Sequence, residues 1–224
     1  MTLREVQIFG FRKSGDKQLN FLINENETPG KDGKMTHGPN AVLSMIDWAL
    51  ETTANPSRLF IIHADNCPGQ NKNRYVIGYF LWRVMTSQQD TIEFLMQIPG
   101  HARCHVDSGF ACVKKAYRRS DIDTMDELAA VVDGSSSTNA AVRYPAWCWR
   151  NWKSFLGEHY NALPGMRKYQ YFRMSSAYPG VVMAKTCSDG EETSLCLLKN
   201  PGFLCTNSAA ARSWIICSTV RLLA

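Results

Sequence analysis

Two aspartates in this sequence each come after an apolar run that is typical of a β-strand. Asp65 ends the run RLFIIHAD, and Asp107 comes just past the next run, TIEFLMQI. In a layered α/β fold, side chains at the carboxyl ends of neighbouring strands meet at one edge of the sheet. Two carboxylates there provide the hard oxygen ligands that hold Mg²⁺ or Mn²⁺ ions about 4 Å apart for phosphoryl transfer. The pattern predicts Asp65 and Asp107 as catalytic metal ligands.

Each aspartate also has a simpler interpretation. Asp107 is well placed to cap the N-terminus of a helix, where aspartate is common, and spacing alone favours that role. Asp65 is harder to explain in this way, because a charge that ends an apolar strand must be solvated, paired or bound to a metal.

The residues that follow Asp65, NCPGQNKNR, cannot contribute to a hydrophobic core. We expect them to hold a phosphate backbone near Asp65, with backbone amides of the Pro-Gly turn joining the contact. The residues with this expected role are Asn66, Gln70, Asn71, Lys72 and Arg74. The alternative is a surface loop whose amide side chains bond their own backbone.

A group of basic residues follows the second aspartate, on a segment with a helical apolar stripe. This basic face consists of Lys114, Lys115, Arg118 and Arg119. We expect it to follow DNA phosphates; the alternative is an ordinary solvated helix face.

Two histidines are candidates for supporting roles beside the aspartates. His63 shares a strand face with Asp65, so it either supports that carboxylate or is a packed histidine. His101 follows Pro-Gly and either orients the turn that carries Asp107 or is a plain loop residue. The tryptophans at 147, 149 and 152 could stack on bases, but anchoring a helix is the favoured role.

The elements that must position these residues follow from hydrophobic periodicity. The sequence predicts a hairpin over 5–25, a helix from Pro39 to before Asn55, and strands at RLFIIHAD and TIEFLMQI with a helix at 74–86 between them. Thr124 and Glu127 form a capping box that begins another helix. A helix beyond residue 146 and three strands, KYQYFRMSS, GVVMAKT and TSLCLLK, complete the pattern. This order of elements is typical of an α/β layer fold.

The sequence also suggests a division of the chain. Residues 1–134 are expected to form the core domain, 135–145 a linker, 146–206 a C-terminal extension and 207–224 a tail of uncertain origin. The linker assignment rests on DGSSSTN, the only low-complexity stretch.

Composition limits the class of protein. The chain has 224 residues, of which 45% are hydrophobic and 20% charged, with a formal net charge of +5. That charge permits a polyanionic partner without requiring one. The eight cysteines form no CxxC pairs, which is typical of reduced thiols, and the N-terminus has no apolar signal-peptide core. We therefore expect an intracellular protein that does not enter a membrane.

Several strings resemble the catalytic region of DDE-type, RNase H-like transposase domains. They are HADNCPGQNKNR, PGH at 99–101, VDSGF at 106–110 and KKAYRR. The resemblance is closer to the transposon-derived domains found in many eukaryotic genomes, and by order of elements it covers residues 5–135. It implies Asp65 as the second acid, Asp107 as the third, a two-metal Mg²⁺ or Mn²⁺ site, DNA as substrate and a nuclear location.

One part of that family's pattern is not found. The family's first acid lies on the strand that opens the domain, whereas this sequence starts almost directly on the hairpin. Asp16, in the hairpin turn, and Asp32, in a loop, are not convincing substitutes. We therefore expect the first strand to be missing, and a site that lacks one acid should bind metal weakly and turn over slowly or not at all.

The expected fold is α/β, with an RNase H-like mixed sheet flanked by helices, its first strand missing, and a small C-terminal α+β extension. The expected function is that of a transposase-derived, nuclease-like domain for divalent-metal-dependent phosphoryl transfer on DNA, catalytically incomplete in this chain. The alternative is a non-catalytic nucleic-acid-binding or protein-interaction module on the same scaffold. A third interpretation is an unrelated α/β protein with a coincidental motif. An oligomer is also possible.

Overall fold

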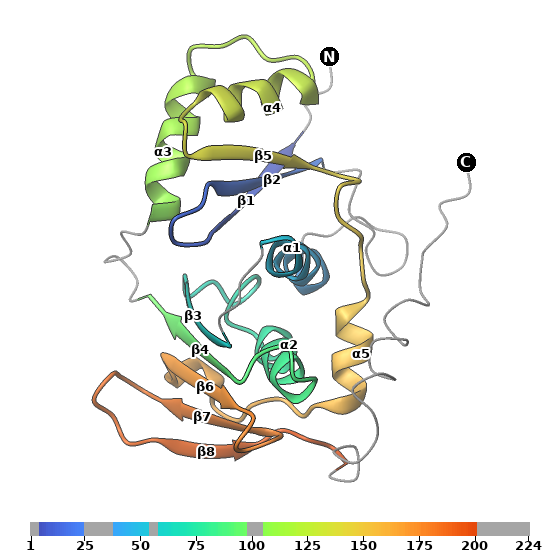
Figure 1. The fold of residues 1–224 in the computed structure, drawn as a ribbon, viewed down its shortest axis with the longest axis vertical. Helices are drawn as coiled ribbons and strands as arrows, with labels where there is room; N and C mark the ends of the chain where they lie inside the picture. Colours follow the sequence, from blue (N-terminus) through green and yellow to red (C-terminus); the bar gives the residue numbers. More distant parts are fainter. Residues whose placement is uncertain (1–4, 25–37, 54–57, 98–104, 201–224) are drawn as a thin grey trace, which may run out of the picture. The chain divides into compact units, whose positions relative to one another are not determined.

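The computed structural model describes residues 5–24, 38–53, 58–97 and 105–200. The chain divides into two compact units, each assembled from separate stretches of sequence. The first unit comprises Met1–His37, Ser44–Ala54 and Arg103–Trp149, and the second comprises Gly38–Leu43, Asn55–Ala102 and Arg150–Ala224. Figure 1 labels the helices and strands of both units.

The first unit contains a three-stranded sheet in the order β1-β2-β5. β1 (Val6–Arg12) and β2 (Gln18–Asn24) form an antiparallel hairpin, as the sequence predicted. Its turn includes Gly15, whose φ of 87° lies in the left-handed region that favours glycine. β5 (Asn139–Arg143) then pairs with β2 in parallel, which makes this sheet mixed.

Two helices, α3 (His105–Tyr117) and α4 (Met125–Gly134), lie on one face of this sheet (Figure 1). The contact is a buried apolar cluster of Leu22, Val113, Leu128 and Val132. The adjacent residue on β2, Phe21, points to the opposite face of the strand, because side chains alternate along a strand.

That opposite face carries aromatic packing. The Phe21 ring lies 5.7 Å from the Trp48 ring of α1 (Pro39–Thr52) and 6.2 Å from the Trp147 ring, edge-on in both cases. Trp147 has only 1% of its surface exposed. Trp147 therefore packs against the sheet as part of the core.

A buried polar network fixes α3 against the sheet. Gln18 Nε2 donates to Asn20 Oδ1 at 2.9 Å, and Asn139 Nδ2 donates to the Gly109 carbonyl at 3.2 Å. Asn20 Nδ2 links the two pairs through Asn139 Oδ1 at 3.4 Å. A Cβ at Gly109 would lie 2.1 Å from Gln18 Oε1, so glycine allows the helix to approach this closely. The network sets the position of the helix that carries Asp107 and the basic face.

The predicted capping box at the start of α4 is confirmed. Thr124 Oγ1 accepts the Glu127 N–H at 3.2 Å, and the Glu127 carboxylate accepts the Thr124 N–H at 2.9 Å. The Asp123 N–H also donates to that carboxylate, at 2.9 Å. These donors, with the Thr124 hydroxyl, lower the pKa of Glu127, because they stabilise its charged form.

The second unit contains a five-stranded mixed sheet in the order β3-β4-β6-β7-β8. Its strands are β3 (Leu59–Ala64), β4 (Thr91–Met96), β6 (Tyr171–Ser175), β7 (Val181–Lys185) and β8 (Thr193–Cys196). β3 and β4 are parallel, and the later neighbours are antiparallel. Every strand that the sequence predicted in this part of the chain is present.

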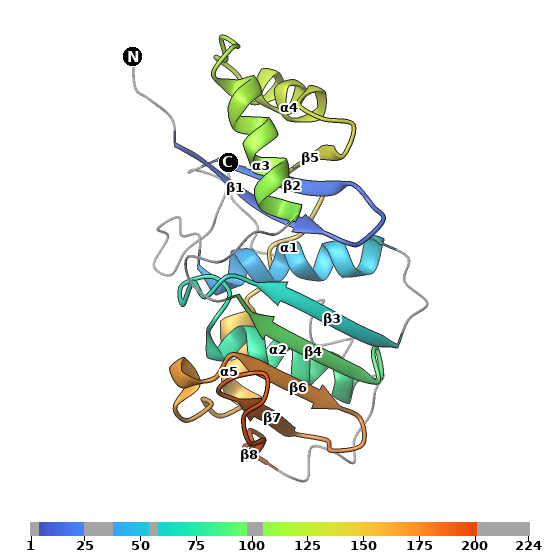
Figure 2. The same ribbon diagram turned by 90° about the vertical axis from the view of Figure 1, so that its left-hand side faces the viewer.

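Two helices, α2 (Arg74–Met85) and α5 (Trp152–His159), lie on one face of the five-stranded sheet (Figures 1 and 2). α2 is buried from Val76 to Val84, as its continuous apolar sequence predicted. Trp152 of α5 packs edge-on against Tyr79 of α2, with ring centres 4.9 Å apart.

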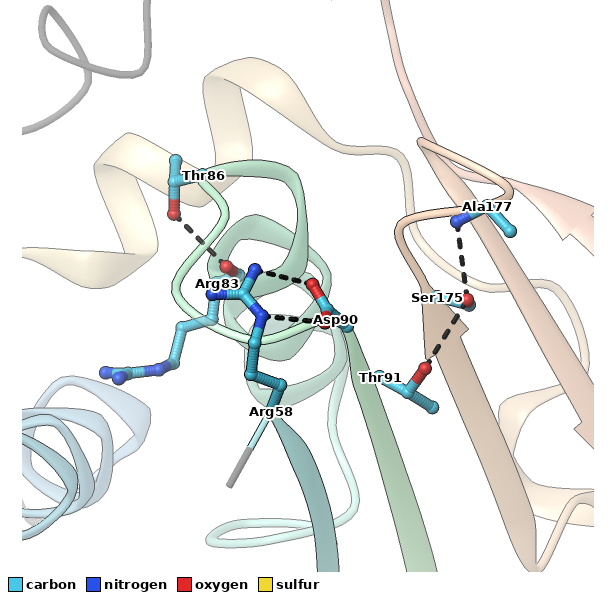
Figure 3. Close-up of polar contacts among 7 residues, drawn as sticks. All are labelled: Arg58, Arg83, Thr86, Asp90, Thr91, Ser175 and Ala177. Carbon is cyan, nitrogen blue, oxygen red and sulfur yellow. Dashed lines mark hydrogen bonds and ion pairs between the residues drawn. The ribbon is translucent and has the colours of Figure 1, made fainter. Parts of the chain in front are cut away.

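The beginnings of β3 and β4 are joined by an ion pair (Figure 3). The Arg58 guanidinium donates to both carboxylate oxygens of Asp90, at 2.6 and 2.5 Å. Thr91, the first residue of β4, donates from its hydroxyl to Ser175 of β6 at 3.5 Å. These contacts join β3, β4 and β6 at the end of the sheet opposite to the one where Asp65 follows β3.

Three features of the predicted organisation differ from the structure. The predicted linker, 135–145, contains β5, which is a strand of the first sheet. The predicted extension, 146–206, supplies β6, β7 and β8 to the same sheet as β3 and β4. The described strands form two sheets where one was expected, because β2 pairs with β5 and β3 pairs with β4. The α/β class is confirmed: two mixed sheets are flanked by helices.

None of the helices in the described ranges combines the length and the apolar character needed to cross a bilayer.

Candidate functional site

Asp65 directly follows β3 and is exposed, but its carboxylate is bound by its own loop. Asp65 Oδ1 accepts the Cys67 N–H at 3.0 Å and the Asn71 side-chain amide at 2.8 Å. The Cys67 carbonyl in turn accepts three N–H groups, from Gln70, Asn71 and Lys72, at 2.9–3.3 Å. The segment 65–73 is called the polar loop below. These hydrogen bonds are therefore made within the loop, with the Cys67 carbonyl and the Asp65 carboxylate as acceptors.

Lys72 lies inside this loop. Its ammonium donates to Asn66 Oδ1 at 2.9 Å and to the Arg167 carbonyl, in the short 3₁₀ turn Met166–Lys168, at 3.1 Å. Only 8% of Lys72 is exposed, and burial lowers the pKa of its amine. The Asn66 amide donates to the Gln97 carbonyl at the end of β4. Both side chains bind segments of the protein, which favours the self-bonded loop over a phosphate contact for these two residues.

Asn73, which the sequence-based site prediction missed, caps α2. Its Oδ1 accepts the Tyr75 and Val76 N–H groups at 3.0 and 3.1 Å, and its amide donates to the Gln70 carbonyl at 3.0 Å. The signal that could have identified it is an asparagine directly before a continuous apolar run, the usual pattern of an N-cap. The loop and the helix therefore share one hydrogen-bond network.

Arg74, the last residue of the motif and the first of α2, faces outward. It is exposed, and its guanidinium lies over the ring of its neighbour Tyr75, 4.7 Å from the ring centre. His63, two residues before Asp65 on β3, is also exposed.

The basic face occupies the outer side of the last turn of α3 and the turn that follows it. Lys114, Lys115, Arg118 and Arg119 are all exposed and, with Ala111, line a surface hollow of about 400 Å³. Gly109 and Val113 are buried on the inner side. Within the described part of the chain, none of the four cations forms an ion pair, so their charges are turned to solvent together.

Asp107 lies in the first turn of α3 and is exposed. It belongs to the first compact unit, whereas Asp65 belongs to the second. Each unit by itself thus contains one of the two predicted metal ligands, and their convergence stays a prediction. Among the described side chains, no group of three or more His, Cys, Asp and Glu residues is arranged to hold a metal ion. His101 lies outside the described residues.

In a comparison with protein-family models, residues 5–189 match a domain of unknown function, DUF7869. The chain belongs to the DUF7869 family. The matched region contains the polar loop, Asp107 and the basic face, and it includes elements of both compact units. The description of DUF7869 assigns no activity. Neither the curated proteins nor the solved structures contain a match to this chain.

Proposed function

We propose that this DUF7869 chain is a DNA-binding domain of transposase descent that contacts the phosphate backbone through the basic face of α3. The observation that carries the proposal is a group of four exposed cations, two in the last turn of α3 and two in the turn directly after it. Residues four apart on a helix are separated by about 6 Å along its axis, so the face presents its charges as a compact stripe. A nuclear location follows from this proposal.

The charge arrangement supports a polyanion rather than a protein with mixed charges. The lining of the hollow contains no acidic residue, so nothing there offsets the four positive charges. Lysine and arginine side chains that neutralise phosphates release condensed counterions, which gives sequence-independent and salt-sensitive binding. The buried network of Gln18, Asn20 and Asn139 holds α3 in place, so the stripe is presented on a fixed helix.

The test is DNA affinity measured at several salt concentrations. A variant with alanine at all four basic-face positions should lose most of its affinity for duplex DNA. Each lost phosphate contact should reduce the slope of log affinity against log salt by about 0.9. A control variant, Lys168→Ala with Lys185→Ala, removes two cations from the second unit and should leave the duplex slope unchanged. If the basic-face variant bound duplex DNA with unaltered affinity and slope, the face would be ordinary solvated surface.

A second candidate function is metal-dependent phosphoryl transfer, with Asp65 and Asp107 as ligands of Mg²⁺ or Mn²⁺. The observation in its favour is the fixed orientation of Asp65, whose Oδ1 is held by two donors at the end of β3. The ions would stabilise the attacking and leaving oxygens of the phosphodiester.

Plasmid nicking in Mn²⁺ tests this second candidate. Asp65→Asn removes the charge but keeps a side-chain oxygen that can accept the Cys67 and Asn71 donors, so the loop should remain folded. If the activity exists, Asp65→Asn and Asp107→Asn should each abolish it, while Asp189→Asn, an exposed carboxylate outside the site, should not. Nicking that survives both site substitutions would exclude this assignment.

A further inference from the structure

A second cationic surface lies in the second unit, where α2 and α5 begin. Arg74, the first residue of α2, stacks on Tyr75 and donates a hydrogen bond to its hydroxyl at 3.0 Å. Lys153, in the first turn of α5, places its ammonium 5.7 Å from the centre of the same ring. One half-buried aromatic ring therefore carries two exposed cations from two helices.

The positive charge of this surface is not compensated within the described residues. Neither Arg74 nor Lys153 forms an ion pair there. Neither helix has an acidic residue in its first turn. Because the N-terminus of a helix carries a partial positive charge, a cation in the first turn is electrostatically unfavourable. Two helices thus begin with an unfavourable charge that an anion would offset.

The surface is also ordered before any ligand binds. The Arg74 guanidinium is held by the Tyr75 hydroxyl and lies against α5, where a Cβ on Gly157 would be 3.7 Å from its nitrogen. Lys199 donates to the Gly157 carbonyl at 2.6 Å, which adds a third cation beside the same turn of α5. A preordered surface loses less conformational entropy on binding than flexible side chains do.

We propose that Arg74, Tyr75 and Lys153 bind single-stranded nucleic acid. Phosphate groups contact Arg74 and Lys153, and one base stacks on the paired side chains of Arg74 and Tyr75. Bases stack on aromatic rings and on guanidinium planes, but only where they are free of a duplex. A surface that contacted phosphates alone would gain nothing from the ring. This surface is distinct from the basic face of α3 and does not depend on it.

The experiment compares single-stranded with duplex DNA binding to the full chain by fluorescence anisotropy. The probe is an oligothymidine of about 20 nucleotides, longer than the ~4–16 nucleotides that one such site covers. Tyr75→Leu, which removes the ring but keeps apolar bulk, should weaken binding of the oligothymidine about tenfold. Arg74→Gln and Lys153→Gln should each lower its salt slope by about 0.7.

Two controls separate the ring from general cation effects. Lys185→Gln removes a cation that lies 5.6 Å from the Tyr171 ring on the sheet of the same unit, and it should leave binding of the oligothymidine unchanged. Tyr75→Phe keeps the ring but removes the hydroxyl that holds Arg74, so it should retain more affinity for the oligothymidine than Tyr75→Leu does.

Three results would overturn the proposal. The first is an unchanged affinity for the oligothymidine in folded Tyr75→Leu. The second is an equal loss of duplex affinity in that variant, since a duplex does not offer a free base. The third is a loss of oligothymidine binding in Tyr75→Phe as large as that in Tyr75→Leu. The alanine variant of the basic face, measured on duplex DNA, tests the proposed function separately, so the two proposals can fail independently.

Discussion

The polar loop of the second unit and the basic face of the first unit both carry side chains that the sequence assigned to DNA, yet the structure uses them differently. In the loop, Asp65, Asn66 and Lys72 are bound to one another or to nearby backbone. At the end of α3 and in the turn after it, the four cations are exposed and form no ion pair within the described residues. An irregular loop leaves backbone groups that amides and carboxylates can satisfy, whereas the backbone of a helix interior is already bonded.

The comparison teaches that polar composition alone does not identify a contact surface. A side chain that completes a loop is needed for stability, and a side chain that faces solvent on a fixed helix is available to a partner. The predictions below separate these two roles, from the largest expected effect to the smallest.

The largest effect is expected for Lys72→Ala. The substitution leaves Asn66 Oδ1 and the Arg167 carbonyl, acceptors in two part-buried bonds, without their donor. An acceptor that is left unsatisfied away from water costs about 1–3 kcal/mol. We expect a loss of about 2–3 kcal/mol in the free energy of unfolding, measured by urea denaturation. The matched variant Lys115→Ala should change it by less than about 0.5 kcal/mol while weakening DNA binding. If Lys115→Ala destabilised the protein and Lys72→Ala only weakened DNA binding, the roles assigned to the polar loop and the basic face would be wrong.

A smaller loss is expected at the cap that joins the polar loop to α2. Asn73→Ala removes the acceptor for the Tyr75 and Val76 N–H groups, and loss of such a cap costs about 1 kcal/mol. Asn73→Asp keeps a capping oxygen and should retain most of the stability in the same urea measurement. An Asp variant as unstable as the Ala variant would show that the bond from the Asn73 amide to Gln70, rather than the cap, holds the loop.

The capping box of α4 gives a prediction for the first unit, in its pH dependence. The pKa of Glu127 is lowered in the folded protein by bonds from Asp123 and Thr124, so its contribution is fully present above the pKa of the unfolded state. It is lost as the pH falls through the lower folded value. The difference in unfolding free energy between the unmodified chain and Glu127→Gln should therefore shrink as the pH falls from 7 to below about 4. A difference that stayed constant with pH would mean that the negative charge of Glu127 does not contribute to the stability given by the capping box.

The smallest effect is expected for the exposed ion pair of Arg58 and Asp90. The bonds from Arg58 lower the pKa of Asp90, but both side chains are more than half exposed, at 56% and 51%. Exposed pairs contribute little because water and salt screen them. Asp90→Asn should leave the melting temperature close to that of the unmodified chain at moderate salt. A clear drop would show that this pair holds the starts of β3 and β4 together.

Local features could be predicted from the sequence because each depends on neighbouring residues. The Thr124–Glu127 capping box, the hairpin of β1 and β2 and the buried helix α2 follow from short-range spacing and apolar periodicity. The basic face of α3 was also predictable, since its residues recur at three- and four-residue intervals opposite the buried Val113.

The tertiary structure decided what local pattern does not encode. Residues 139–143 read as the end of a serine-rich linker and became a strand, because β2 has a second edge and Asn139 can bond to Asn20 and to Gly109. Lys72 read as a phosphate ligand and is buried, because its two acceptors come from Asn66 and from Arg167, 95 residues away. Hydrogen-bond partners that lie far apart in sequence leave no periodic signal. Whether a polar side chain is buried or faces solvent is therefore decided only when the chain has folded.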